Sequence, residues 1–371
     1  MKTILKKPIA MHYRVIITIL ISLFFSEFGS GQSFSEKRTF RKSFRVNKEI
    51  TLEVNNKYGS IHISPCNSDS VTIEAEVEAV ASNQERIEKM LQGININISE
   101  SSFLIRAQTD FTQNISMLFE SFKGMTNKLI PYESKIQINY FITAPEYLNI
   151  RVINKYGDVY MENNTGTFSI DLSNGSFKAN TLKKSGGIDL NFCDATINKI
   201  SEGYIDASFS ELVIGESDNL TISSLSSRFD LKKAGTLDTK SRRDKFFIGS
   251  VNSIRGNSYF TDYKIEKVED EINLVSKYGK ITADFIEKSI GMVTINCGYT
   301  DVYLTFDPSL SYNVDIRHIN TFLVLPEKNA SIEKKTISED KKEFMTIGTI
   351  GRNPGNIKVR IDATRGNIYI K

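Results

Sequence analysis

The pattern that decides the fold is written three times in succession: FSIDLSNGSFKAN at residues 168–180, GGIDLNFCDATIN at 186–198 and GYIDASFSELVIG at 203–215. Each copy holds two short runs of alternating apolar and polar residues, separated by a polar turn such as Asn174-Gly175. Successive side chains of a strand point to opposite faces, so each run has one apolar face. The pattern predicts paired short β-strands that bury one side.

The repeat extends from residue 149 to about residue 325. The first strand of each coil has a central residue, which is Arg151 in the first coil and Asp315 in the last. These central residues follow one another at steps of 18, 18, 17, 17, 17, 17, 18, 21 and 21 residues. The residues after these centres form a column predicted to point inward: Val152, Ile170, Ile188, Ile205, Ile222, Thr239, Gly256, Leu274, Ile295 and Ile316. A second inward column is Val159, Phe177, Ala195, Leu212, Phe229, Phe246, Tyr263, Ile281, Val302 and Phe322.

Two alternating strands per fixed period favour a β-solenoid over a sandwich, in which strand spacing is less uniform. One coil cannot bury its own apolar face, but coils stacked about 4.8 Å apart share a core. Ten such coils would make a rod on the order of 50 Å long. The predicted fold class is therefore all-β, a β-solenoid with coils of about 17–18 residues and small helical insertions near the N-terminal end.

The turns between the strands carry recurring residue types. Glycine follows Tyr156, Asn174 and Tyr278, and we expect it there because tight turns often need a positive φ. Tyrosine recurs at the same turn position: Tyr58, Tyr156, Tyr278 and Tyr299. Stacked tyrosines would stabilise the corners, and a carbohydrate-binding aromatic row is the functional alternative.

The N-terminus has the layout of a secretory signal peptide. A basic segment precedes the 11-residue apolar run Val15–Phe25, and small residues follow at Gly29 and Gly31. We expect cleavage after Gly31, with Met11 as an alternative start. A retained membrane anchor is the other interpretation, but the run is shorter than the roughly 20 residues that span a bilayer. No later segment is apolar enough to cross a membrane as a helix.

The predicted organisation has four parts. Residues 1–31 are the signal peptide, 32–148 are strands with a helical insertion that cap the solenoid, 149–325 are the solenoid repeats, and 326–371 are an insertion and a final coil. Within the cap, Ser82 to Gly93 is predicted to be a short helix capped by Ser82 or Asn83. Phe111 to Ile130 has apolar residues at helical spacing and is predicted to pack over the solenoid end, with partner binding as the alternative.

Charge and cysteine content limit the classes of function. The formal net charge is +3, which is too small for a nucleic-acid footprint. Exported proteins often carry disulfides, but Cys66, Cys193 and Cys297 are odd in number and far apart in the sequence. We interpret them as core or near-core residues, while one pair with one free thiol stays open.

A recurring Asn-Lys-Tyr-Gly-(Ser/Asp)-(Ile/Val) element carries a resemblance to a known family. It occurs at residues 56–61 and 154–159, with variants at 276–281 and 298–302. Together with the signal peptide and the short repeated strands, it resembles the family of adhesin-like proteins with β-helical repeats, which includes the head GIN domain group of autotransporter adhesin-like proteins. The resemblance covers most of the mature chain. It implies a β-helical fold and a role in adhesion, and it supplies no catalytic residues.

One carboxylate column could carry chemistry: Asp171, Asp189 and Asp206 occupy one register in three consecutive coils. Stacking would place them roughly 5 Å apart. The alternatives are a Ca²⁺ site, a sugar-cleaving carboxylate set, or the polar outer face that every such strand needs. We favour the polar face, because the next residues in the column are Ser223 and Lys240.

The remaining residues point away from catalysis. The mature part has His62 and His318 as its histidines, and their sequence context supports neither a triad nor a zinc site. We therefore expect no catalytic residues, no cofactor and no metal. The hypothesis is an exported, non-enzymatic β-solenoid of the periplasm, outer membrane or cell surface that binds an envelope protein or a glycan. The alternative is a polysaccharide-active lyase or hydrolase on the same scaffold.

Overall fold

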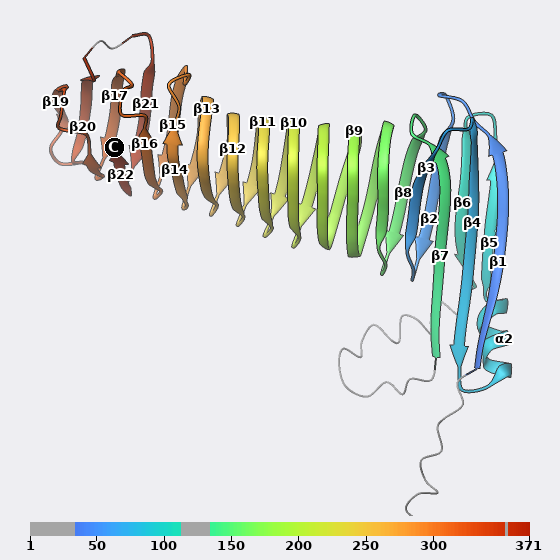
Figure 1. Cartoon of the computed structure of the whole chain (residues 1–371). Coiled ribbons are helices and arrows are strands. Elements are labelled where there is room, and N and C mark those ends of the chain that lie inside the picture. The colour runs from blue at the N-terminus through green and yellow to red at the C-terminus, as the bar shows by residue number, and fades with distance from the viewer. Residues whose placement is uncertain (1–33, 113–133, 353–354) are drawn as a thin grey trace, which may run out of the picture.

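The computed structural model describes residues 34–112, 134–352 and 355–371 (Figure 1). Strands make up 76% of it and join in one sheet of 22 strands, with one helix among the described residues. The predicted all-β class is therefore confirmed. The expected signal peptide at 1–31 and nearly all of the predicted helical segment at 111–130 lie outside the described residues.

The N-terminal part combines antiparallel and parallel strands. β4 pairs antiparallel with both β1 and β7, while β2 and β3 pair parallel with the repeats. The elements of this part are β1 (Phe34–Arg45), β2 (Thr51–Lys57), β3 (Ile61–Cys66), β4 (Ser70–Ala81), α2 (Gln84–Gln92), β5 (Ile94–Glu100), β6 (Leu104–Phe111) and β7 (Ser134–Pro145).

The helix α2 forms where the sequence predicts it. The side chain of Asn83 accepts a hydrogen bond from the backbone N–H of Arg86, and the N–H of Gly93 donates to the carbonyl of Met90. These bonds satisfy groups that a helix end leaves open. Ile87, Met90 and Leu91 are the buried face of the helix.

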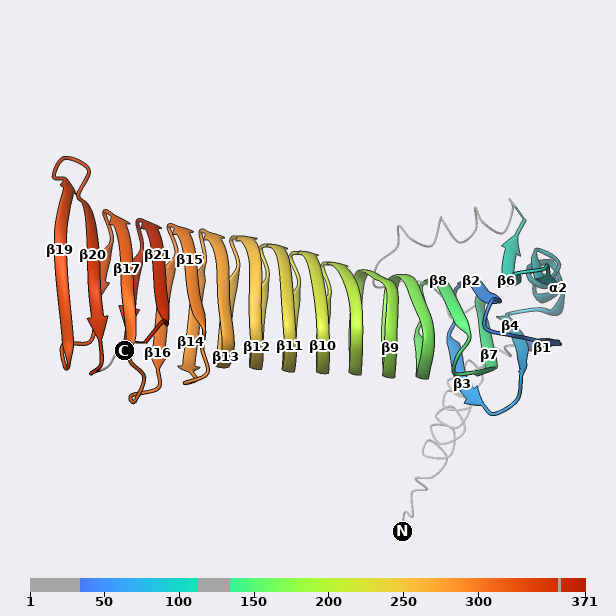
Figure 2. The same ribbon diagram turned by 90° about the horizontal axis from the view of Figure 1, so that it is seen from above.

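The central part is a series of rungs, each made of a first strand, a corner and a second strand, that lie side by side (Figures 1 and 2). Neighbouring rungs pair in parallel, mostly at offsets of 17 residues. The strands are β8 (Asn149–Lys155), β9 (Val159–Ser208), β10 (Glu211–Leu225), β11 (Arg228–Arg242), β12 (Lys245–Tyr259), β13 (Asp262–Lys277), β14 (Lys280–Ile286), β15 (Met292–Gly298), β16 (Asp301–Phe306), β17 (Tyr312–Ile319) and β18 (Phe322–Val324).

Residues of the predicted inward columns are register partners in neighbouring rungs. Ile205 pairs with Ile222, and the column continues through Thr239, Gly256 and Leu274 to Ile295. In the second column the ring centroids of Phe229 and Phe246 are 4.6 Å apart, and both side chains are buried. Each such burial contributes about 1.5–3 kcal/mol, which makes the shared interior the main source of stability.

Three positions of these columns are not aliphatic or aromatic residues that point inward. Thr239 and Gly256 replace aliphatic residues, and the Tyr263 hydroxyl lies 2.8 Å from Thr239 Oγ1 in the interior. The prediction that Phe322 points inward is wrong: Phe322 is 59% exposed, and Leu323 pairs with the buried Ile368. The inward residue of this rung is Leu323, which aligns with Val302 through Ile368, and an error of one residue in the expected register exchanges the two faces of a strand.

The corners have left-handed backbone conformations at residues that are not glycine. Tyr156 has φ 59° and Tyr278 has φ 57°, so the positive φ falls on the tyrosine rather than on the following glycine as we expected. Gly157 is required for another reason, because a Cβ there would lie 2.0 Å from the carbonyl oxygen of Gly59 in the neighbouring rung. The backbone N–H of Tyr156 donates to the carbonyl of Ser173 at 3.0 Å, which ties one corner to the next.

The C-terminal strands do not follow the order of the sequence. They are β19 (Ala330–Ser338), β20 (Glu343–Ile350), β21 (Lys358–Thr364) and β22 (Asn367–Ile370). β21 lies between β15 and β17 and is parallel to both (Figure 2). β20 pairs antiparallel with β17, and β19 forms the edge beyond it. The edge strand carries Glu333, Lys334 and Lys335, and such charges discourage edge-to-edge association.

All three cysteines are free. Cys193 and Cys297 are buried, and burial raises the pKa of the Cys297 thiol to about 12. Cys66 is half-buried at the end of β3. The structure therefore contains no disulfide between these residues. Among the described residues no helix has the length and apolar character to cross a membrane.

Candidate functional site

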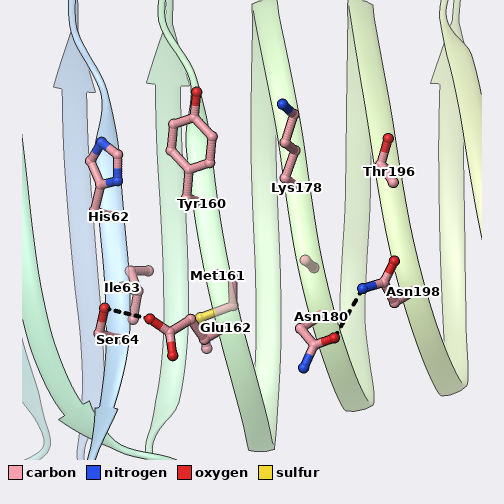
Figure 3. A pocket seen from close by; sticks show the side chains of 11 residues that line it. His62, Ile63, Ser64, Tyr160, Met161, Glu162, Lys178, Asn180, Thr196 and Asn198 are labelled. Atoms are coloured by element: carbon pink, nitrogen blue, oxygen red, sulfur yellow. Dashed lines mark hydrogen bonds between the residues drawn. The ribbon is translucent and has the colours of Figure 1, made fainter.

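A groove of about 340 Å³ lies on the outer face of four neighbouring rungs, over β3 and the first part of β9 (Figure 3). Two rows of outward side chains border it. The first, which we name the ring row, contains His62, Tyr160, Lys178 and Thr196; the second, the amide row, contains Ser64, Glu162, Asn180 and Asn198. The rows arise because outward residues recur at every second position of a strand and neighbouring rungs align them.

Two members of the ring row, His62 and Tyr160, are stacked rings. The His62 ring stacks on Tyr160 with centroids 4.5 Å apart and on Phe141 with centroids 5.3 Å apart. Lys178 Nζ lies 5.9 Å from the centroid of the Tyr160 ring. The faces of these rings are therefore covered by neighbours, and the groove meets their edges and polar atoms.

Burial lowers the pKa of His62, while the negative charge of Asp158 acts in the opposite direction. His62 Nε2 lies 3.0 Å from Ser60 Oγ. Burial, followed by the charge of Asp158, raises the pKa of Tyr160, whose hydroxyl donates to Asp158 Oδ2 at 3.2 Å. Both side chains are thus favoured in their neutral forms and offer hydrogen bonds rather than charge.

The amide row is held by hydrogen bonds from rung to rung. Asn198 Nδ2 donates to Asn180 Oδ1 at 3.0 Å, and Asn180 Nδ2 donates to Asn163 Oδ1 at 2.9 Å. Ser64 Oγ donates to Glu162 at 2.9 Å. These bonds fix the side chains in place while leaving further amide and carboxylate atoms for a ligand.

The predicted carboxylate column lies on the first strands of the rungs, across the corner from the groove. Asp171 pairs with Ile153 and Asp206 with Ser223, at the same outward register. Burial raises the pKa of Asp189, and the charges of Asp206 and Asp171 raise it further. The charges of the two neighbouring carboxylates therefore reach Asp189. Within the described residues, no group of three or more His, Cys, Asp or Glu is placed to hold a metal ion.

The four predicted turn tyrosines form two separate pairs. Tyr58 stacks on Tyr156 at 5.5 Å, and Tyr278 stacks on Tyr299 at 4.9 Å. Sequence reasoning missed the other aromatic corners, where Phe192 stacks on Phe209 at 5.0 Å and Phe260 on Tyr278 at 4.9 Å. The signal was present as the 17- and 18-residue spacing, but glycine does not follow these phenylalanines. A sugar platform needs a free ring face, and stacking covers the faces that these pairs share.

The groove residues themselves were not predicted as a site. The structure places the side chain of His62 on the outer face of β3, in the ring row. Residues 61–64 come from the N-terminal part, and the remaining groove residues, within 160–198, return beside them through β9. The pairing of β3 with β9 is a long-range contact that the period of the repeat does not reveal.

No protein-family description and no curated protein matches this chain. Solved structures with some likeness include a putative cell adhesion protein from Clostridium sporogenes, at 13% identity and TM-score 0.19, covering 91% of this chain and 99% of that one. A putative adhesin from Parabacteroides distasonis has 12% identity and TM-score 0.32, covering 72% and 93%. A putative lipid binding protein from the same species has 6% identity and TM-score 0.33, covering 72% and 96%. Likenesses at these values carry no argument about function.

Proposed function

We propose that this chain is an exported, non-enzymatic β-solenoid that binds an extended glycan of the cell envelope or cell surface in the groove bordered by the ring row and the amide row. The observation that carries the proposal is the repetition of hydrogen-bonding side chains along the groove at the spacing of the rungs. Repeat architectures present extended binding surfaces of this kind.

The register of the rungs supports the solenoid. Parallel pairing at a constant offset continues from β9 through β10, β11 and β12. The four-part organisation belongs to the same proposal: signal peptide 1–31, capping region 32–148, repeats 149–325 and C-terminal region 326–371. Export follows from the basic segment, the apolar run and the small residues before position 32.

The chemistry of the groove favours a polyhydroxyl ligand. Lys178 and Glu162 bring one charge of each sign, and the remaining polar lining residues offer neutral hydroxyl, amide and imidazole groups. Neutral hydrogen-bonding groups suit a ligand that is rich in hydroxyls. Glu162 is the one carboxylate among the groove's lining residues, whereas sugar cleavage uses two carboxyl groups about 5–10 Å apart.

The proposal is tested by affinity electrophoresis of the chain from residue 32 in gels that contain envelope polysaccharides. We expect retardation by at least one glycan, and its loss in the double variant Lys178→Ala/Asn198→Ala. The matched control is Lys264→Ala, because Lys264 lies on β13 in the same outward register, outside the groove. Retardation that persists in the double variant would contradict the proposal. So would the absence of retardation in every gel that contains a glycan.

The alternative of a polysaccharide-active enzyme is favoured by the raised pKa of Asp189 between two other carboxylates. Tuned carboxyl pairs supply the acid and the base of glycoside cleavage. Incubation with the same polysaccharides and analysis of chain length separates the two functions. Shortening that is abolished by Asp189→Asn would establish the enzyme instead.

A further inference from the structure

The rung formed by the last residues of the chain is enclosed on both sides by residues that precede it. Ile361 of β21 pairs with Ile295 of β15 on one side and with Ile316 of β17 on the other. In β22, Ile368 pairs with Val302 of β16 and Leu323 of β18. This C-terminal rung therefore occupies a slot between two rungs that are consecutive in the sequence.

The order of synthesis leaves this slot open until β21 and β22 have been made. The chain passes from β16 to β17 through residues 307–311 and then forms β18, β19 and β20 before residue 358 exists. N-terminal parts of a chain generally fold first during synthesis. Until β21 and β22 arrive, the slot exposes strand edges and apolar side chains on both of its sides.

The slot and the strands that fill it are complementary. Val359, Ile361, Ala363, Ile368 and Ile370 are each at most 1% exposed, and they alternate with outward polar residues. Asn367 also donates its backbone N–H and its side-chain amide to Asp301 Oδ1, both at 2.9 Å. A strand pair with this pattern and spacing satisfies the slot, and a second copy of the chain carries an identical pair.

The connection to the C-terminal rung is longer than its path requires. Seven residues, 351–357, join β20 to β21 across β17. The crossing spans two strand separations, about 9.6 Å, whereas seven extended residues reach about 23 Å. The length of the connection therefore does not by itself confine the rung to its own slot.

We propose that the C-terminal rung is an exchangeable element: when two copies fold together, β21 and β22 of each fill the slot of the other and join the molecules at this end. The partner is a second copy of this chain, and the contact is donation of a parallel strand pair. Such exchange of an identical element is a general route to dimers. It is independent of ligand binding in the groove.

Two full-length variants in a Cys66→Ser background test the exchange. One carries Asn296→Cys and the other Asp362→Cys; these positions are register partners with exposed side chains, so they meet when a rung fills the slot. The variants are unfolded together, refolded at increasing total concentration and oxidised. We expect a disulfide-linked pair of the two variants, whose fraction increases at least several-fold with concentration at refolding.

The control mixture combines Ser223→Cys with Lys240→Cys, which are register partners of β10 and β11, rungs that follow one another in the chain. We expect no cross-linked pair above background in this mixture. A single chain with both Asn296→Cys and Asp362→Cys verifies that this position oxidises. If that chain oxidises while the mixed Asn296→Cys and Asp362→Cys variants cross-link no more than the control mixture, the exchange does not occur.

Discussion

The backbone N–H of Ser227 donates a hydrogen bond of 2.7 Å to Oδ1 of Asp244, inside the stack and one rung away. The same position one rung earlier has Ser210, whose N–H donates to Ser227 Oγ at 3.2 Å. A column of small polar side chains therefore follows the corners through the interior. It supplies acceptors for backbone groups that the turn removes from the strand ladder.

Replacement of Asp244 tests the importance of this column. Asp244→Leu leaves three donors without an acceptor, namely Ser227 N–H, Ser224 Oγ–H and Arg242 N–H, at a site that is 2% exposed. Each buried donor without a partner costs about 1–3 kcal/mol, so we expect a loss of about 3 kcal/mol or more in the free energy of unfolding. Urea denaturation measures it.

The matched control for this change is Asp244→Ser. Serine occupies the equivalent place at Ser210 and Ser227, where its hydroxyl accepts a backbone N–H. We expect Asp244→Ser to lose about 1 kcal/mol, the worth of an ordinary hydrogen bond. Equal losses in the serine and leucine variants would show that the acceptor at this position does not matter.

Gly157 provides a test of how closely the corners approach. A Cβ at this position would lie 2.0 Å from the carbonyl oxygen of Gly59. Gly157→Ala therefore forces the two backbones apart, and we expect a loss of about 3 kcal/mol, at the upper end of the cost of overpacking. Thermal unfolding followed by circular dichroism measures it. Gly355→Ala is the control, because a Cβ there meets nothing within 4 Å, and its melting temperature should not change.

The left-handed conformation of Tyr156 leads to a different test. At φ 59°, a β-branched residue is strained whereas asparagine is tolerated, and Asn174 adopts φ 56° at the same corner of the next rung. We expect Tyr156→Val to be less stable than Tyr156→Asn by about 1–2 kcal/mol. Both variants lose the stacking with Tyr58, so the difference between them isolates the backbone. Equal stability would mean that the corner relaxes.

These corners also show which features of the fold could be predicted from the sequence and which could not. The period and the apolar columns predicted the all-β class and the inward residues, because burial of alternate side chains requires apolar residues at alternate positions of the sequence. The positive φ of Tyr156 could not be predicted from the sequence, because tyrosine has no general preference for that conformation. We expected the glycine beside it to supply the positive φ, but the glycine is needed because the neighbouring backbone approaches it closely.

Two larger features were beyond sequence reasoning. The groove depends on β3 lying beside β9. The position of β21 depends on its pairing with both β15 and β17, between which it lies. Residues 357–361 match the repeat equally well as a last rung or as an inserted one. Pattern alone identifies a rung, whereas its place in the stack is set by which edges are open when it forms.

His318 predicts a pH dependence at the C-terminal end. Its side chain is 2% exposed, its Nε2 lies 3.3 Å from Thr346 Oγ1, and it packs beside Phe344 of β20. Burial lowers the pKa of His318, and the charge of Lys334 on β19 lowers it further, while a backbone contact at Thr321 opposes them. The folded state therefore binds the proton less readily than the unfolded chain, whose pKa is about 6.5.

The sign of the effect follows from this difference. Between the lowered pKa of His318 and about 6.5, the unfolded chain binds more protons than the folded state. The free energy of unfolding therefore rises with pH across that window, and this contribution to stability is lost as the pH falls. Because β20 pairs directly with β17, we expect faster amide exchange in β19 and β20 near pH 5 than near pH 7, after correction for intrinsic rates. His318→Phe should remove most of this dependence. His62→Phe is the control, and loss of the dependence in that variant instead would assign the effect to the groove end.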